Sequence, residues 1–356
     1  MVATYNSAQN TIISYLTEPV PTMSTVDTAA ETPQDPHNTT PPKLAVVLSI
    51  ILAVAFIVAV IAGARIMTDR TTYTPAAVSP IDAPEAGSRA CDDVIANLPD
   101  SLGAFKNVDI VEPAPEGTKA YKNAKGEQLT LRCGVYAPDQ YTVLSKTNTI
   151  KDVHWLTVTD ATPGSHMRTY YQLGGAPTVA ITTEAPIGTA LEDASSALAV
   201  HIDTSKAPKP KPFPLSSTRL EGDGHPQQCT RFLDALPKTI GDYTLRDTSA
   251  IKGATSQSRT WLADGQEPIV VRCGVELPDS YTPGAVLSQV GEVPWFDEPG
   301  LARGSTSGRW FALGREAIVA LSMPGSEGNE VISTITDTVA DTLAPEKPEK
   351  PENSTN

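Results

Sequence analysis

The sequence predicts an α+β protein that contains two tandem copies of a small antiparallel-sheet domain with flanking helices, plus one transmembrane helix. Three observations predict this fold class. A sequence block recurs after 140 residues, each copy holds two cysteines at equivalent positions, and a run of 21 uncharged residues precedes both copies. With 356 residues, the chain is long enough for two domains of ordinary size.

The uncharged run, Leu44–Ala64, is expected to cross a membrane. As an α-helix its 21 residues extend about 31 Å, which matches the hydrocarbon thickness of a bilayer. Lys43 and Arg65 flank the run and can reach the two interfaces. The small residues 62–64 also fit a signal-peptide cleavage site, but the run is longer than a usual signal core, so we favour an uncleaved anchor.

Two cues to the orientation of this helix disagree. Lys43 precedes it and Arg65 and Arg70 follow it, so the positive-inside rule slightly favours a cytoplasmic C-terminal part. The four cysteines favour the opposite, because paired cysteines persist in oxidising compartments. We give the cysteines more weight and expect a single-pass protein of the cell membrane whose C-terminal domains are extracytoplasmic.

The duplication rests on three blocks that recur in the same order. Leu131–Tyr141 matches Val271–Tyr281 at seven of eleven positions, and Val153–Trp155 matches Val293–Trp295 at the same offset. Upstream, a Cys…Leu-Pro block at 91–99 recurs at 229–237. The predicted organisation is a disordered tail 1–43, a transmembrane helix 44–64, a linker 65–90, repeat unit 1 at 91–203, a Pro/Lys-rich linker 204–228, repeat unit 2 at 229–344 and a disordered tail 345–356. Met23 is an alternative start.

Each unit is predicted to open and close with an amphipathic helix and to hold short strands between them. The opening helices have apolar faces at Cys91, Val94, Ile95 and Leu98, and at Cys229, Phe232, Leu233 and Leu236. The closing helices have them at Leu191, Ala194, Leu198 and Ile202, and at Ile332, Ile335, Val339 and Leu343. Thr189 and Glu192 predict a capping box. Strands are expected at 108–111, 128–136, 155–159, 169–173 and 178–182, with counterparts at 269–275, 309–313 and 317–321.

The four cysteines are predicted to form the disulfides Cys91–Cys133 and Cys229–Cys273. Their separations are 42 and 44 residues, and each unit had to fold alone after the duplication arose. Buried free thiols are one alternative. A zinc site is another, but the chain contains no C-x-x-C pair.

Two pairs of equivalent residues are candidate ligand contacts. Arg132 and Arg272 could bind a carboxylate or phosphate, although an ion pair with Asp139 or Asp279 or a solvated sheet face is the alternative that we favour. Trp155 and Trp295 could stack on a sugar ring, although packing against the disulfide in the core is favoured.

Charge and motifs restrict the classes of function. The net charge of −14 disfavours binding to nucleic acids or anionic lipids. The five histidines form no repeated pattern, and no G-x-S-x-G, H-E-x-x-H or Walker motif occurs. We therefore expect no metal, no cofactor and no catalytic residues, although a Ser-His-Asp arrangement assembled in space stays open.

An N-terminal anchor followed by Cys…Leu-Pro, Arg-Cys-Gly-Val and Val-x-Trp resembles an actinobacterial family of membrane-anchored or secreted proteins, the domain of unknown function 3515. The resemblance covers both units and is most specific over residues 131–155 and 271–295. It implies a membrane location and no particular activity. A tandem copy departs from the single-domain form of the family.

The leading functional hypothesis is a non-enzymatic envelope protein that binds a cell-wall or protein partner. It follows from duplication without a catalytic constellation. The alternatives are an envelope hydrolase that acts on wall polymer with two carboxylates in one cleft, and a sensor ectodomain.

Overall fold

The structure is a computed structural model that describes residues 43–160, 162, 164–298 and 306–346. The tails predicted as disordered and the alternative start at Met23 lie outside these residues, apart from a few positions at the tail boundaries. The described residues from Ala62 onward form one compact unit.

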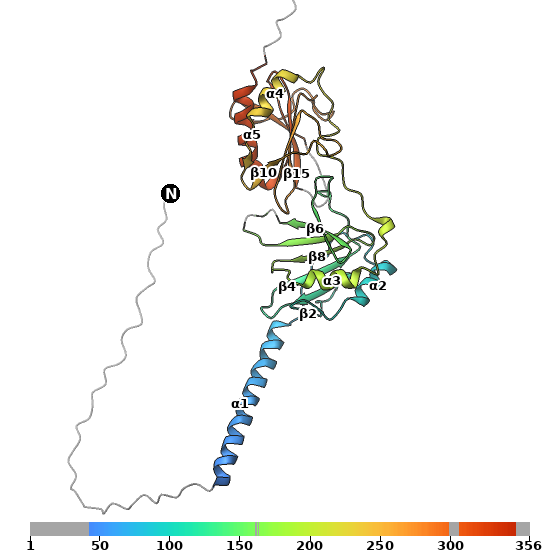
Figure 1. The fold of residues 1–356 in the computed structure, drawn as a ribbon, viewed down its shortest axis with the longest axis vertical. Helices are drawn as coiled ribbons and strands as arrows, with labels where there is room; N and C mark the ends of the chain where they lie inside the picture. Colours follow the sequence, from blue (N-terminus) through green and yellow to red (C-terminus); the bar gives the residue numbers. More distant parts are fainter. Residues whose placement is uncertain (1–42, 161, 163, 299–305, 347–356) are drawn as a thin grey trace, which may run out of the picture. The chain divides into compact units, whose positions relative to one another are not determined.

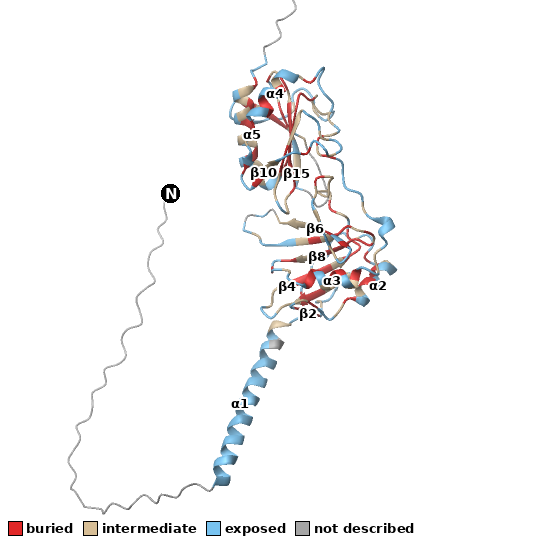
Figure 2. Ribbon diagram, viewed as in Figure 1, coloured by how far each residue is buried: buried red, intermediate tan, exposed pale blue. Residues whose placement is uncertain are grey.

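The predicted membrane span lies within one long helix, α1 (Lys43–Thr72). Within its first 26 residues, Lys43–Thr68, the most apolar window of 18 residues has a mean hydropathy of 3.3, and none of that window is buried by the protein. Figure 2 shows α1 exposed along its length. By length and composition this helix can anchor the chain in a membrane or act as a signal sequence.

Each repeat contains one eight-stranded sheet in which all neighbouring strands are antiparallel (Figure 1). The strand orders are β1-β2-β3-β4-β8-β7-β6-β5 and β13-β14-β15-β16-β12-β11-β10-β9. The strands of the first repeat are β1 (Ser101–Leu102), β2 (Phe105–Val108), β3 (Thr118–Lys122), β4 (Gln128–Cys133), β5 (Thr147–Ile150), β6 (Val153–Thr159), β7 (Arg168–Gln172) and β8 (Val179–Thr183). Those of the second are β9 (Thr239–Ile240), β10 (Tyr243–Arg246), β11 (Ser258–Leu262), β12 (Ile269–Cys273), β13 (Ser288–Val290), β14 (Val293–Glu298), β15 (Ser307–Ala312) and β16 (Val319–Pro324).

Two helices pack on one face of each sheet, so the predicted fold class is confirmed. They are α2 (Arg89–Asn97) and α3 (Ala190–Leu198) in the first repeat, and α4 (Pro226–Ala235) and α5 (Gly328–Thr342) in the second. The Ser88 hydroxyl caps α2 by accepting a hydrogen bond from the Cys91 N–H, as helix N-termini require. The helix faces and the alternate residues of the strands form one core in each repeat.

The disulfides join these layers. The Cys91–Cys133 bond links α2 to β4, and the Cys229–Cys273 bond links α4 to β12. Both Cα–Cα distances are 5.5 Å, within the range that a disulfide allows. All four cysteines are buried, none is free, and this is the pairing that the duplication predicts.

The segments before the two opening helices were predicted as linkers, but parts of both pack on the sheets. Residues 73–87 and 211–224, which we call the straps, lie on the opposite face of each sheet from the helices. Ala76 of the first strap is buried with Val108 and Ala120, and Phe213 and Leu215 of the second are buried in an apolar cluster that includes Phe311. Burying these apolar sheet residues stabilises the straps against the entropy of a free linker.

Two local predictions are also wrong. Thr189 has helical backbone angles and forms no side-chain cap, so the predicted capping box is absent. Instead, the Asp193 carboxylate accepts a hydrogen bond from the Gly103 N–H at 2.8 Å. The strands β1, β3, β5, β9, β10, β11, β13 and β14 were not predicted, because most are short and lack a clear apolar alternation. The strand predicted at 108–111 overlaps β2 only at Val108.

Candidate functional site

The two equivalent arginines hold the straps. A guanidinium nitrogen of Arg132 donates to the carbonyl of Ser79 at 3.2 Å. Arg272 Nη1 donates to the carbonyl of Leu215 at 2.8 Å and to the Thr218 hydroxyl at 3.1 Å. Ser79 and Leu215 occupy matching positions in the two straps. The N–H of Glu85 donates to the carbonyl of Gly134, and the N–H of Glu221 donates to the carbonyl of Gly274. Ser79 and Leu215 each lie six residues before these glutamates.

This position leaves little of either guanidinium for a ligand. Burial lowers the pKa of Arg132, while the nearby Tyr171 acts to raise it, and burial also lowers the pKa of Arg272. The alternative of an ion pair with the turn aspartates is wrong. Asp139 pairs with Lys211 at 3.1 Å, and Asp279 pairs with Arg219 at 3.0 Å.

The glycine of the Arg-Cys-Gly-Val motif has a matching structural role. Gly134 and Gly274 have φ of +78° and +72°, a region that side-chain-bearing residues rarely adopt. A Cβ on Gly134 would overlap the backbone of Glu85, and one on Gly274 would overlap the backbone of Gly224. The motif therefore fastens the strap through its arginine and glycine, and the opening helix through its cysteine.

The two tryptophans lie in the cores and cannot stack on a sugar. Both side chains are fully buried. The Trp155 indole N–H donates to the Ser195 hydroxyl of α3 at 2.8 Å, and that of Trp295 donates to the Thr336 hydroxyl of α5 at 2.9 Å. Each indole thus joins the sheet to the closing helix of its repeat.

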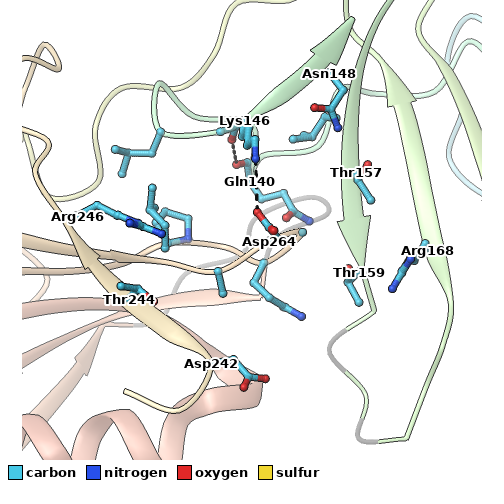
Figure 3. A pocket seen from close by; sticks show the side chains of 18 residues that line it. Gln140, Lys146, Asn148, Thr157, Thr159, Arg168, Asp242, Thr244, Arg246 and Asp264 are labelled. Carbon is cyan, nitrogen blue, oxygen red and sulfur yellow. Dashed lines mark hydrogen bonds and ion pairs between the residues drawn. The ribbon is translucent and has the colours of Figure 1, made fainter. Parts of the chain in front are cut away.

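A different set of residues lines a large cleft of about 600 Å³ (Figure 3). Residues 140–148 and strands β6 and β7 of the first repeat form one wall, and β10 with the β11–β12 turn of the second forms the other. The N–H of Thr159 donates to the carbonyl of Gly265 at 2.9 Å across the two repeats. Most lining side chains are polar, including Gln140, Asn148, Thr157, Thr159, Thr244 and Gln266.

The cleft carries five charged side chains. Lys146 pairs loosely with Asp264 at 3.8 Å, and both side chains are largely exposed, at 80% and 98%. Thr244 and Arg246 lie on the same face of β10, because strand side chains alternate, and Asp242 lines the cleft from the turn just before that strand. Arg168 and Thr159 are a cross-strand pair, so their side chains share one face. Figure 3 shows Arg168 and Arg246 on opposite sides of the cleft.

The unpaired arginines distinguish this cleft from a second one. Within the described residues, neither Arg168 nor Arg246 has a hydrogen-bond or ion-pair partner for its side chain. The second cleft, of about 290 Å³, contains Arg219 bound to Glu276 at 2.6 Å and Arg309 bound to Glu298 at 2.6 Å. Its arginines neutralise carboxylates of the protein, whereas those of the large cleft are available to a ligand.

Among the described residues that line the large cleft, none is the buried acid that a glycosidase needs. Such an acid is kept protonated by apolar surroundings. Asp242 and Asp264 line the cleft, but both are exposed, and Asp264 pairs with Lys146. No group of three or more His, Cys, Asp or Glu residues placed to hold a metal ion occurs in the described ranges.

The cleft was not predicted from the sequence, because its arginines are not among the residues that the two units share. Arg168 corresponds to Gly308, and Arg246 corresponds to Val108, as the strand pairings show. The cleft arginines therefore occur once each. The polar residues Asp242, Thr244 and Arg246 were the one available signal, and they lie in and just before a strand that was not predicted.

The fold and the disulfides define the class of this protein, which is a tandem-repeat α+β protein with one disulfide in each repeat. The chain belongs to the DUF3515 family, described as a protein of unknown function, whose family model matches twice, at residues 50–207 and 203–348. Both matches reach upstream of the opening helix and so include the strap. No curated protein and no solved structure shows significant similarity to the chain.

Proposed function

We propose that this protein is a membrane-tethered binding protein of the actinobacterial cell envelope, with its two repeats outside the cytoplasm and no catalytic role. The observation that carries the proposal is the combination of two buried disulfides, one in each repeat, with one long apolar helix that the protein leaves exposed. Structural disulfides persist in oxidising compartments, and an apolar helix exposed on all sides requires a lipid environment.

The cleft supports binding rather than catalysis. It is polar and within the size range of ligand-binding pockets, and its walls belong to sheets braced by disulfides. A hydrolase that acts on wall polymer is supported less well, because the carboxylates that line the cleft are exposed.

Substituted-cysteine labelling tests the orientation. Lys209 is exposed in the segment between the repeats and has no side-chain partner among the described residues. A membrane-impermeant maleimide should label Lys209→Cys in intact cells, and should label Thr39→Cys, on the other side of the helix, only after lysis. Labelling of Thr39→Cys alone in intact cells would place the repeats in the cytosol and refute the proposal.

Co-sedimentation tests the binding role. The full chain, solubilised in a neutral detergent, should sediment with purified cell-wall material and should leave that material undegraded. Release of soluble wall fragments during the incubation would instead support the hydrolase.

A further inference from the structure

We propose that the large cleft binds a sparsely charged acidic glycan, meaning a chain of mostly neutral sugars with isolated carboxylate or phosphate groups. This inference rests on the proposed binding function and names the chemistry of its ligand. The carrying observation is that Arg168 and Arg246, on opposite walls of a polar cleft, have no partner within the described parts of the protein.

Unpaired guanidinium groups favour anions. Each offers a planar fork of N–H donors that matches a carboxylate or a phosphate. The cleft contains three cationic and two anionic side chains, so its net charge is +1. Residues 71–356 as a whole contain 24 basic and 36 acidic residues, a net charge of −12. The cleft is thus a small positive region on an acidic protein.

This charge distribution excludes densely charged polymers. A nucleic acid carries a charge on every residue, and most of those charges would face the acidic surface outside the cleft. A glycan with one acidic group for every few sugars places a charge at an arginine and neutral units elsewhere. The acidic surroundings therefore select for sparse charge.

The neutral lining favours sugars between the charges. Asn148 and Gln266 offer amide groups, and Thr157, Thr159 and Thr244 offer hydroxyls. These groups can both donate and accept hydrogen bonds, as sugar hydroxyls do. A cleft of about 600 Å³ holds a short oligosaccharide.

Binding of defined oligosaccharides to the full chain in neutral detergent micelles tests the inference. The probes are a hyaluronan tetrasaccharide for carboxylate, pentamannose 6-phosphate for phosphate, and chitotetraose as the neutral control. We expect at least one acidic probe to bind about tenfold more tightly than chitotetraose, and the better one identifies the acidic group. Equal affinity for neutral and acidic probes, or no binding of either acidic probe, would overturn the inference.

Matched variants locate the binding. Arg168→Gln and Arg246→Gln should each raise the dissociation constant of the acidic probe about tenfold and reduce its dependence on salt. Arg89→Gln removes the same charge from an exposed arginine of α2 outside the cleft, so it should leave the affinity unchanged. All three residues are exposed, and unchanged melting temperatures would verify folding. Equal weakening by Arg89→Gln would show nonspecific attraction and overturn the site. If the acidic probes do not bind but Lys209→Cys is labelled from outside the cell, the glycan proposal is refuted and the proposed orientation still stands.

Discussion

Removing the hydroxyl that accepts the Trp295 hydrogen bond should destabilise the second repeat by about 1–3 kcal/mol. The indole N–H donates to Thr336 at 2.9 Å, and both side chains are almost fully buried. Thr336→Val keeps the shape and the β-branched character of the side chain but leaves a buried donor without a partner, which costs about 1–3 kcal/mol. Thr336→Ser keeps the hydroxyl and should cost only about 1 kcal/mol for the lost methyl group.

Urea denaturation of the full chain in neutral detergent, followed by far-UV circular dichroism, measures both effects. In the background of Trp295→Phe, where the donor is gone, Thr336→Val should cost close to nothing. The first repeat already uses a serine at this place, since Ser195 accepts the bond from Trp155. A valine variant that is as stable as the serine variant would refute the reasoning that this bond stabilises the contact between sheet and helix.

Three further predictions concern single features of the repeats. Replacing Cys229 and Cys273 together by alanine should cost about 4 kcal/mol for a loop of 44 residues, measured by urea denaturation against the oxidised wild type without reductant. Tyr243→Phe should be neutral or slightly stabilising at pH 7, because the buried hydroxyl has no hydrogen-bond partner among the residues that the structure describes and Phe105 occupies the equivalent position. Burial raises the pKa of Tyr243, so the wild type should lose more stability than this variant as the pH rises above about 10, and equal losses would contradict this assignment. Gly134→Ala should lower the free energy of unfolding by at least about 2 kcal/mol, because the new Cβ would overlap the strap. Gly126 has a similar φ but open space around it, so Gly126→Ala should cost about half as much. Equal melting temperatures of the two variants would contradict the overlap with the strap.

The fold class was predictable because the duplication shows the same pattern of cysteines and apolar residues twice in one sequence. Equivalent cysteines selected one disulfide pairing, and helical spacing located both opening helices. The straps were not predictable, because residues 76–86 and 212–222 share no evident sequence pattern and consist largely of residues typical of linkers. Their apolar contacts appear only when the sheet behind them is formed.

The residues of the candidate site, unlike those of the common fold, could not be predicted by comparing the two repeats. Residues that recur in both units, such as Arg132 and Trp155, proved to fasten the strap and the closing helix. Residues that both copies need are those that maintain the common fold. A site formed by joining two copies instead uses residues such as Arg168 and Arg246 that differ between them, so a search for shared residues cannot find it.

The redox state of the four cysteines in living cells tests the central claim most directly. Cells are quenched in acid, the protein is denatured, and free thiols are tagged with a maleimide that adds mass. If both repeats are braced by disulfides outside the cytoplasm, no cysteine is tagged until a reductant is added, and peptide mapping links Cys91 to Cys133 and Cys229 to Cys273. Tagging of all four cysteines without reductant, or a bond from Cys91 to Cys229, would contradict it.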